Sequence, residues 1–499
     1  MDSDEDRDGP VSPSVWRYAK ATRAHVVIDV DGYFELMRDA MIGARQRIFM
    51  IGWDFDTRIL LAGGRRWWNL PRGGRYPARL GAFIVWLVRH FKGVEVRILK
   101  WNFGSIKFVL RGTMFVDLIR WLINRSIDFK FDSAHPIGCS HHQKIVVIDD
   151  RMAVCGGIDM TSDRWDTRAH LHEEPRRRNP NGKFHEPWHD MTMMLEGDVA
   201  RDLAELGRSR WNTAGGKPFD ACAPQDETPW PTRLNAEFRD VEVGIARTRA
   251  EHNGKPAIHE IENLFLEHIR RAKRFVYAET QYFASRKIAE AISERLLEPD
   301  PPEFVIINPY TADGWLEQTA MDTARVRLVH AMKDYDRLGR FGLFIPFTSG
   351  GTPIYVHAKL MIVDDEIIRV GSANMNNRSM GLDTECDVFI DAQRPGNEHI
   401  VPAITRIRHS LLAEHCAIAE EDVGPLIEEY GSMAAMIDSR SKEGKRLERY
   451  VLPEISDAEK ALADSALLDP ESPDDFFDVF EPIEKRGLFR RGSLLRRPK

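Results

Sequence analysis

Two short motifs in this sequence contain residue types that can cleave a phosphodiester. Each motif is a histidine, a lysine two residues later and an aspartate five residues after the lysine. The first copy consists of His142, Lys144 and Asp149, and the second consists of His357, Lys359 and Asp364. One copy would be a weak signal in a chain with 17 histidines, but two copies in matching positions are specific.

The spacing of each motif suits a phosphate group. Side chains two residues apart lie on the same face of a strand, so each histidine and its lysine can meet one phosphate. Cleavage needs a nucleophile, a proton for the leaving oxygen and donors for the non-bridging oxygens. The two histidines can supply the first two through a phosphohistidine intermediate, and their near-symmetry does not say which one attacks. We expect no cofactor, because this chemistry needs no metal and no metal-ligand cluster is visible.

Two carboxylates, Asp190 and Glu385, begin matching predicted strands and are candidate partners of His142 and His357 respectively. A carboxylate orients an imidazole and stabilises its charged form. The two histidines need opposite protonation states, so we expect their surroundings to separate their pKa values. Asp149 and Asp364 each precede a second aspartate, and we interpret them as turn residues that organise the site more than as proton donors.

A small-residue element follows each motif, as Gly156-Gly157 in the first half and Gly371-Ser372 in the second. Glycine lets the backbone approach a phosphate closely. The expected phosphate-binding residues are therefore Lys144, Lys359, Asn374, Gly157, Ser372 and Asp159.

The elements around the motifs also occur twice, in the same order. A helical pattern and a short strand over residues 31–55 match residues 261–283. Four later strands match in the pairs 94–101 with 303–310, 128–133 with 343–349, 142–150 with 357–365, and 190–197 with 385–392. Alternating strands and helices predict an α/β fold, and the shared order predicts a duplication.

The duplication sets the expected domain boundaries. Gly215, Gly216 and four prolines between positions 218 and 231 indicate a linker. We predict a disordered segment over residues 1–24, a first half over 25–212, a linker over 213–237, a second half over 238–430 and an extension over 431–499 with an acidic and then basic tail.

Composition places the chain among globular proteins. Hydrophobic residues make up 43% and charged residues 29%. A net charge of −7 disfavours a nucleic-acid-coating protein, so we expect no nucleic-acid partner. Five cysteines without metal-ligand spacing and no secretory or membrane-spanning pattern predict a cytoplasmic protein or one peripheral to the cytoplasmic membrane face, with secretion by another route left open. A monomer is compatible with the sequence.

Longer stretches around the motifs carry a resemblance. GGIDMTSDRWDT (156–167), EPWHDMTMMLEG (186–197), ETQYF (279–283) and IYVHAKLMIVDDEIIRVGSANMNNRSM (354–380) are similar to the phospholipase D superfamily, in its eukaryotic-type, phosphatidylcholine-cleaving branch. The resemblance implies a duplicated α/β/α sandwich with two mixed sheets and one active site at the pseudo-two-fold interface. It also implies His142 as nucleophile, His357 as general acid and a phospholipid substrate at a membrane surface. Asp159 stands where many superfamily members have Asn.

Three activities fit this chemistry. The first hypothesis is hydrolysis of glycerophospholipids to phosphatidic acid and a headgroup alcohol. A phosphatidyltransferase similar to cardiolipin synthase is the alternative, and a nuclease of the same superfamily is less favoured.

Three segments outside the motifs are further candidates for contact with lipid. The basic and aromatic loop Arg65–Tyr76 suits a membrane interface or a stacking platform for single-stranded nucleic acid, and packing of its tryptophans on the core is the alternative. The basic tail 485–499 is expected to be a disordered solvated segment, with contact to anionic lipid as the alternative. The charged segment Arg164–Glu186, with His170, His172 and His185, is expected to be a solvated loop, with the lip of the active-site entrance as the alternative.

Overall fold

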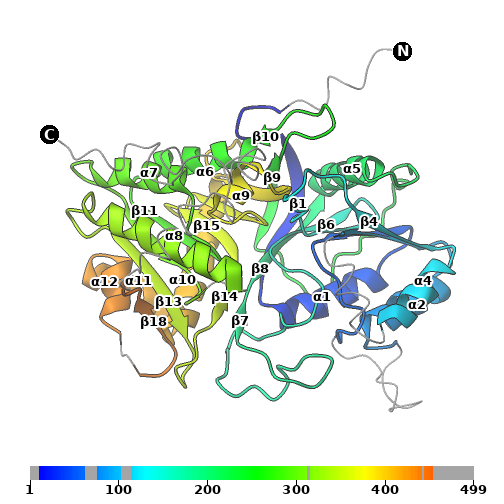
Figure 1. Cartoon of the computed structure of the whole chain (residues 1–499), viewed down its shortest axis with the longest axis horizontal. Coiled ribbons are helices and arrows are strands. Elements are labelled where there is room, and N and C mark those ends of the chain that lie inside the picture. The colour runs from blue at the N-terminus through cyan, green and yellow to red at the C-terminus, as the bar shows by residue number, and fades with distance from the viewer. Residues whose placement is uncertain (1–9, 62–75, 103–113, 312–314, 441–442, 453–499) are drawn as a thin grey trace.

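A computed structural model describes residues 10–61, 76–102, 114–311, 315–440 and 443–452 (Figure 1). The loop at 65–75 and the tail at 485–499 therefore lie outside the described residues. The strands of the first half are β1 (Arg17–Ile28), β2 (Arg47–Gly52), β3 (Glu95–Trp101), β4 (Ile127–Asp132), β5 (Ile145–Ile148), β6 (Met152–Gly156), β7 (Trp188–His189) and β8 (Met191–Gly197). Those of the second half are β9 (Phe238–Arg249), β10 (Ile258–His259), β11 (Phe275–Thr280), β12 (Glu303–Ile307), β13 (Phe341–Phe347), β14 (Tyr355–Val356), β15 (Lys359–Val363), β16 (Ile367–Gly371), β17 (Glu385–Asp391) and β18 (Arg446–Arg449).

Helices flank the sheet in both halves (Figure 1). The first half contains α1 (Val30–Ile42), α2 (Leu80–His90), α4 (Met114–Leu122) and α5 (Asp198–Thr213). The second contains α6 (Glu260–Arg271), α7 (Arg286–Leu296), α8 (Trp315–Lys333), α9 (Asn377–Gly381), η3 (Glu398–Ile400), α10 (Val401–Cys416), α11 (Glu420–Tyr430) and α12 (Met433–Asp438).

The strand order confirms the predicted duplication. From the edge to the centre, the first half runs β4-β3-β2-β5-β6-β8-β1 and the second runs β13-β12-β11-β15-β16-β17-β9. In each half the three outer strands of this series are parallel and the next, β5 or β15, is antiparallel to them. The two halves are thus mixed α/β units of one topology.

The two expected sheets are joined into one. β1 pairs antiparallel with β9, from Arg17 opposite Ile245 to Ala24 opposite Phe238, which makes one 16-stranded sheet. Each of these strands would otherwise be the open edge of its half, and their pairing satisfies both rows of backbone groups.

The structure corrects two predicted boundaries. Residues 17–24, expected to be disordered, form most of β1 at the centre of the sheet. Small buried side chains at Ala19, Ala21 and Ala24 let this strand pack between neighbours, so it lacks the bulky alternation that marks a strand in sequence. At the other end, β18 pairs with β13, so part of the expected extension belongs to the sheet.

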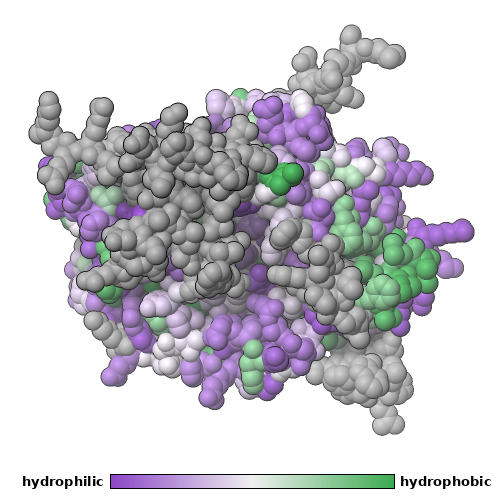
Figure 2. All heavy atoms as spheres, viewed as in Figure 1, coloured by the Kyte–Doolittle hydropathy of each residue, from purple (hydrophilic) through white to green (hydrophobic). Residues whose placement is uncertain are grey.

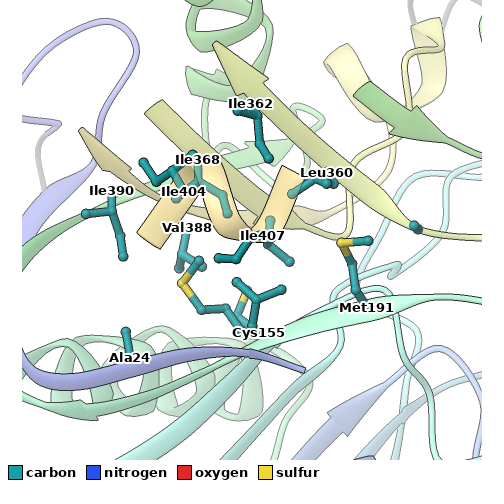
Figure 3. Packing of buried hydrophobic residues seen from close by; sticks show 14 of the residues in the cluster. Ala24, Cys155, Met191, Leu360, Ile362, Ile368, Val388, Ile390, Ile404 and Ile407 are labelled. Carbon is teal, nitrogen blue, oxygen red and sulfur yellow. The ribbon is translucent and has the colours of Figure 1, made fainter. Parts of the chain in front are cut away.

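The largest hydrophobic core crosses the boundary between the halves. It contains Ala24 and Cys155 from the first half and Val388, Ile404 and Ile407 from the second (Figure 3). Cys155 Sγ donates to the backbone oxygen of Cys386 across this boundary at 3.3 Å. The halves therefore share a core as well as a sheet.

An apolar patch interrupts the otherwise mixed described surface at α4 (Figure 2). Its exposed side chains are Phe115, Val116, Ile119, Leu122 and Ile123. In the described part of the chain, every helix is too short or too polar to span a lipid bilayer.

Candidate active site

The two motif histidines lie just before matching strands, β5 and β15. Lys144 directly precedes β5, and Lys359 is the first residue of β15. A two-stranded parallel ladder between β7 and β14 brings the halves together here, with Val356 opposite His189. The His357 backbone N–H donates to the His189 carbonyl at 2.7 Å, which places His357 beside Asp190.

Each histidine pairs with the carboxylate of the other half. His357 Nδ1 lies 2.7 Å from Asp190 Oδ2, and His142 Nδ1 lies 3.1 Å from both Glu385 oxygens. The partners expected from the sequence were the reverse and are wrong. The sequence identified both carboxylates but not their pairing. Each histidine extends across the interface to the end of a strand in the opposite half. The His142 backbone N–H, for example, donates to the Thr384 carbonyl at 2.9 Å.

These contacts set the tautomer of His142. Its Nδ1 lies 3.0 Å from the Ser372 carbonyl, which can only accept, so Nδ1 carries the hydrogen and donates it. The lone pair of the neutral ring is then on Nε2. Among the described residues, no hydrogen bond occupies Nε2 of His142.

Burial dominates the electrostatics of both pairs. It lowers the pKa of His142 and of His357 well below the ordinary value. It raises the pKa of Asp190 to about 7 and that of Glu385 to about 8. The pKa values of the two histidines are thus shifted in the same direction, because the pseudo-symmetric halves bury both rings.

The lysines and the amide complete one shared site. Lys144 Nζ donates to the His142 carbonyl at 2.7 Å, and Lys359 Nζ donates to the His357 carbonyl and, at 3.2 Å, to Gln281 Oε1. Burial lowers the pKa of Lys359 to about 7, and its charge interacts with carboxylates from both halves. Asn374 donates to the same Gln281 oxygen at 3.4 Å.

Asp159 lies beside the lysine of its own half. Its Oδ2 is 3.3 Å from Lys144 Nζ, and its Oδ1 accepts the backbone N–H of Trp53 at 3.1 Å. The matching Asn374 is a donor toward Gln281, so the two halves differ at this pair. Asp159 thus reduces the charge that Lys144 presents.

The motif aspartates lie at the far ends of the strands from the histidines. Asp149 accepts the backbone N–H groups of residues 45, 46 and 47 at 2.7–2.8 Å. Asp364 accepts those of residues 273, 274 and 275 at the same distances. Both have positive φ, of 55° and 56°, in tight turns. Their contacts are those of organising turn residues.

The glycine element makes room for side chains of the neighbouring strand. A Cβ on Gly157 would lie 2.2 Å from Asp190 Oδ1, and one on Gly371 would overlap Asp387. Ser372, the counterpart of Gly157, donates its hydroxyl to Glu385 at 2.5 Å. Gly157 therefore leaves room for Asp190, the carboxylate that contacts His357.

Three site residues escaped the sequence reasoning. The Trp188 ring lies 5.1 Å from that of His357, with the Arg164 guanidinium 3.8 Å above the indole. Gln281 connects Lys359 to Asn374. Gln281 matches Trp53 in the repeat, and Trp188 lies two residues before Asp190. Their positions beside these elements are the sequence signal that could have identified Gln281 and Trp188 as site residues.

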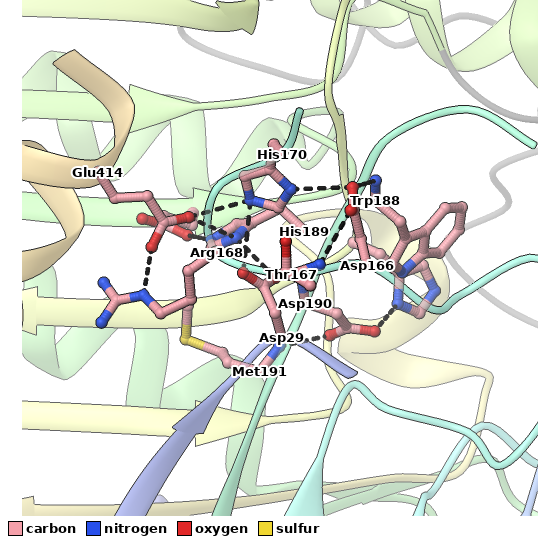
Figure 4. A network of polar contacts seen from close by, with 12 residues as sticks. Asp29, Asp166, Thr167, Arg168, His170, Trp188, His189, Asp190, Met191 and Glu414 are labelled. Carbon is pink, nitrogen blue, oxygen red and sulfur yellow. Dashed lines mark hydrogen bonds and ion pairs between the residues drawn. The ribbon is translucent and has the colours of Figure 1, made fainter. Parts of the chain in front are cut away.

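The segment 164–186 is not a fully solvated loop as expected. His170 is 1% exposed and Arg177 is 4% exposed, so both are interior residues. His170 bonds Asp166 and Glu414 at 3.0 Å each, within a buried polar network behind Asp190 (Figure 4). Sequence spacing could not show this, because Glu414 belongs to the other half.

Two family models match this chain. A family model described as phospholipase D matches residues 120–290 and 347–464, which is more than half of the chain. A model described as the PLD-like domain of cardiolipin synthase matches residues 265–402.

Curated relatives are similar to this chain in sequence, and a solved structure is similar to it in fold. Phospholipase D alpha 1 of Brassica oleracea is 25% identical and that of Arabidopsis thaliana is 26% identical, each over 77% of this chain and 63% of its own length. The chain therefore spans less than two thirds of these relatives. The phosphatidylserine synthase structure of Haemophilus influenzae aligns with a TM-score of 0.51 and 12% identity, over 84% of this chain and 96% of that one, which confirms the α/β fold.

Proposed function

Because this chain belongs to the phospholipase D family, we propose that it hydrolyses glycerophospholipids to phosphatidic acid and a headgroup alcohol at a membrane surface. The observation that carries the proposal is the crossed arrangement of His142 with Glu385 and His357 with Asp190. It assembles two histidines and two lysines from different halves around one site. The chain's relatives named phospholipase D alpha support a lipid substrate.

In the first step, His142 Nε2 attacks phosphorus. A bond forms between Nε2 and phosphorus as the bond from phosphorus to the headgroup oxygen breaks. His357, entering protonated, gives its proton to that oxygen and releases the alcohol. Its 2.7 Å contact with Asp190 supports this role, because the carboxylate stabilises an imidazolium.

In the second step, water resolves the phosphohistidine. His357 takes a proton from water, the hydroxyl oxygen bonds to phosphorus, and the bond to His142 Nε2 breaks. Lys144, Lys359 and Asn374 offset charge on the non-bridging oxygens in both steps. Binding of the anionic phosphate favours the charged forms of Lys359 and His357, which burial disfavours in the free site.

The test is incubation of the protein with mixed phospholipid vesicles, both with and without excess EDTA, and analysis of products by mass spectrometry. We expect phosphatidic acid from the wild type, and a loss of about 10⁴-fold or more in His142→Ala and in His357→Ala. His172→Ala, outside the site but in the same protein, is the matched control and should keep full activity.

An added alcohol distinguishes hydrolysis from transfer. A phosphatidyl ester formed in preference to phosphatidic acid would replace the hydrolase by the phosphatidyltransferase, which the cardiolipin synthase-like match supports. Absence of any lipid product from folded protein would overturn both the hydrolase and the phosphatidyltransferase. Nucleic acids would then be the next substrates to test.

A further inference from the structure

A second cluster of chemically active side chains lies behind the active site and takes no part in the proposed reaction. It consists of Asp29 at the end of β1, His170, His189 in β7 and Glu414 in α10 (Figure 4). One atom from each residue lies within 4.8 Å of the others. All four side chains are at most 4% exposed. Three come from the first half and Glu414 comes from the second.

We propose that these four residues bind one Zn²⁺ ion in a closed, four-coordinate site that fastens the two halves together behind Asp190. Two imidazole nitrogens and two carboxylate oxygens are ligands that zinc accepts in tetrahedral sites. The two carboxylates balance the charge of the dication. The site is structural, because four protein ligands leave no position for a substrate.

The distances between the donor atoms fit a tetrahedron. Zinc bonds of about 2.0–2.2 Å place neighbouring ligand atoms about 3.3–3.6 Å apart. His170 Nε2 lies 3.4 Å from Asp29 Oδ2 and 3.0 Å from Glu414 Oε1. His189 Nδ1 lies 3.5 Å from Glu414 Oε1. With Asp29 Oδ2 as the ligand oxygen, these three distances are close to the edges of a zinc tetrahedron.

The ring nitrogens of both histidines that face away from the centre of the cluster already contact carboxylates. His170 Nδ1 lies 3.0 Å from Asp166 Oδ2, and His189 Nε2 lies 2.6 Å from Glu279 Oε2. A carboxylate on the outer nitrogen is the usual support of a zinc-bound histidine, since it orients the ring and strengthens the ligand.

The carboxylate ligands have matching support. Arg168 Nε donates to Glu414 Oε2 at 2.5 Å, and the Asp190 backbone N–H donates to Asp29 Oδ1 at 3.2 Å. The other oxygen, Asp29 Oδ2, is buried and accepts no hydrogen bond from the described residues. It is directed at the centre of the cluster, where an ion would satisfy it.

The backbone is held in unusual conformations at two of the ligands. Asp29 has φ of 63° and His170 has φ of 41°, in a region that residues with a side chain rarely adopt. Such conformations persist where surrounding contacts fix them, and they occur often at ligand sites. Here they point both side chains inward.

The alternative is a metal-free network in which both imidazoles are protonated and paired with the carboxylates. Lys445, 4.0 Å from Glu414 Oε1, would then be one of several surrounding cations. This alternative predicts the same contacts but no bound metal, so metal content separates the two.

The test measures zinc in the full chain. The protein is incubated with equimolar Zn²⁺, passed over a chelating resin and analysed by inductively coupled plasma mass spectrometry. We expect about one zinc per chain in the wild type, and loss of most of it in His170→Ala and in Glu414→Ala. Two controls should retain it: His172→Ala, two residues from a ligand, and the double variant His142→Ala with His357→Ala.

The outcomes separate clearly. A wild type without zinc overturns the inference, as does zinc that is kept in both ligand variants or lost in the active-site double variant. If the ligand variants fail to fold, X-ray absorption of the zinc-loaded wild type decides: about four nitrogen or oxygen neighbours at ~2.0–2.1 Å support the site, and sulfur neighbours or six ligands refute it.

Because zinc is measured without lipid, this result is independent of the hydrolase assay. Zinc bound to an inactive protein would overturn only the proposed activity, and an active protein without zinc would overturn only this site.

Discussion

Glu385 is the residue whose ionisation should be easiest to detect in the stability of the protein. Burial raises its pKa from 4.5 to about 8, and burial lowers the pKa of its partner His142 below 6.5. Below pH 6.5 the two effects on stability oppose each other. The unfolded chain holds a proton on His142 that the folded chain lacks, whereas the folded chain holds a proton on Glu385 that the unfolded chain lacks. Of these two groups, only the glutamate contributes between pH 6.5 and 8, and its contribution to stability falls as pH rises.

Glu385→Gln should remove this loss of stability. From pH 6.5 to 8 we expect the ionisation of Glu385 to reduce the free energy of unfolding of the wild type by up to about 2 kcal/mol, at ~1.4 kcal/mol per pH unit. The variant should lack this contribution to the pH dependence of the free energy of unfolding. Its lost hydrogen bonds lower the free energy of unfolding by the same amount at both pH values. Urea denaturation at the two pH values measures it, with the exposed Glu421→Gln as control. Equal slopes in all three proteins would contradict the assignment.

At the scale of elements, two tight turns hold the strands that carry the histidines. Asp364 accepts three backbone N–H groups from the start of β11, and Asp149 does the same at β2. Each carboxylate therefore connects the far end of a motif strand to its neighbour and fixes the register of the pair.

Asp364→Asn should reduce stability and leave the chemistry intact. Asparagine tolerates positive φ but replaces a charged acceptor, so we expect a loss of about 1–3 kcal/mol in the free energy of unfolding. Activity per folded molecule should stay within a few-fold, and Asp149→Asn should behave alike. A variant with unchanged stability and abolished activity would instead make Asp364 a catalytic group.

The apolar face of α4 is the element best suited to contact a bilayer. Leu122 and Ile123 are among its most exposed side chains, and the proposed substrate lies in a lipid surface. Leu122→Glu with Ile123→Glu should weaken sedimentation with phospholipid vesicles by about tenfold or more, since burial of each side chain is worth ~1.5–3 kcal/mol. Leu297→Glu with Leu338→Glu, on other exposed leucines, is the control. Equal binding of both double variants would exclude this face.

At the scale of the molecule, the halves form one cooperative unit. The sheet is continuous through β1 and β9, and the main core contains residues of both halves. Neither half alone contains a complete pair of histidine and carboxylate. Unfolding should therefore involve both halves at once.

Ile245→Ala tests this cooperativity, because Ile245 is fully buried in β9 within the shared core. We expect a loss of about 2–5 kcal/mol and one calorimetric transition at a lower temperature. Two transitions, with only one shifted, would show that the halves unfold separately.

The sequence by itself determined the duplicated α/β order, the two motif histidines and lysines, and both candidate carboxylates. These rest on local periodicity and on spacing within one strand, which the chain encodes over a few residues. Asp149 and Asp364 belong to the same class, because a turn is a local structure.

Only the tertiary structure decided which carboxylate serves which histidine, that β1 joins the halves, and that His170 faces Glu414 244 residues away. The physical reason is that each depends on the pairing of one half with the other. Strand partners across an interface and buried polar contacts are fixed by packing of the whole chain, and no local pattern near His142, Arg17 or His170 records them.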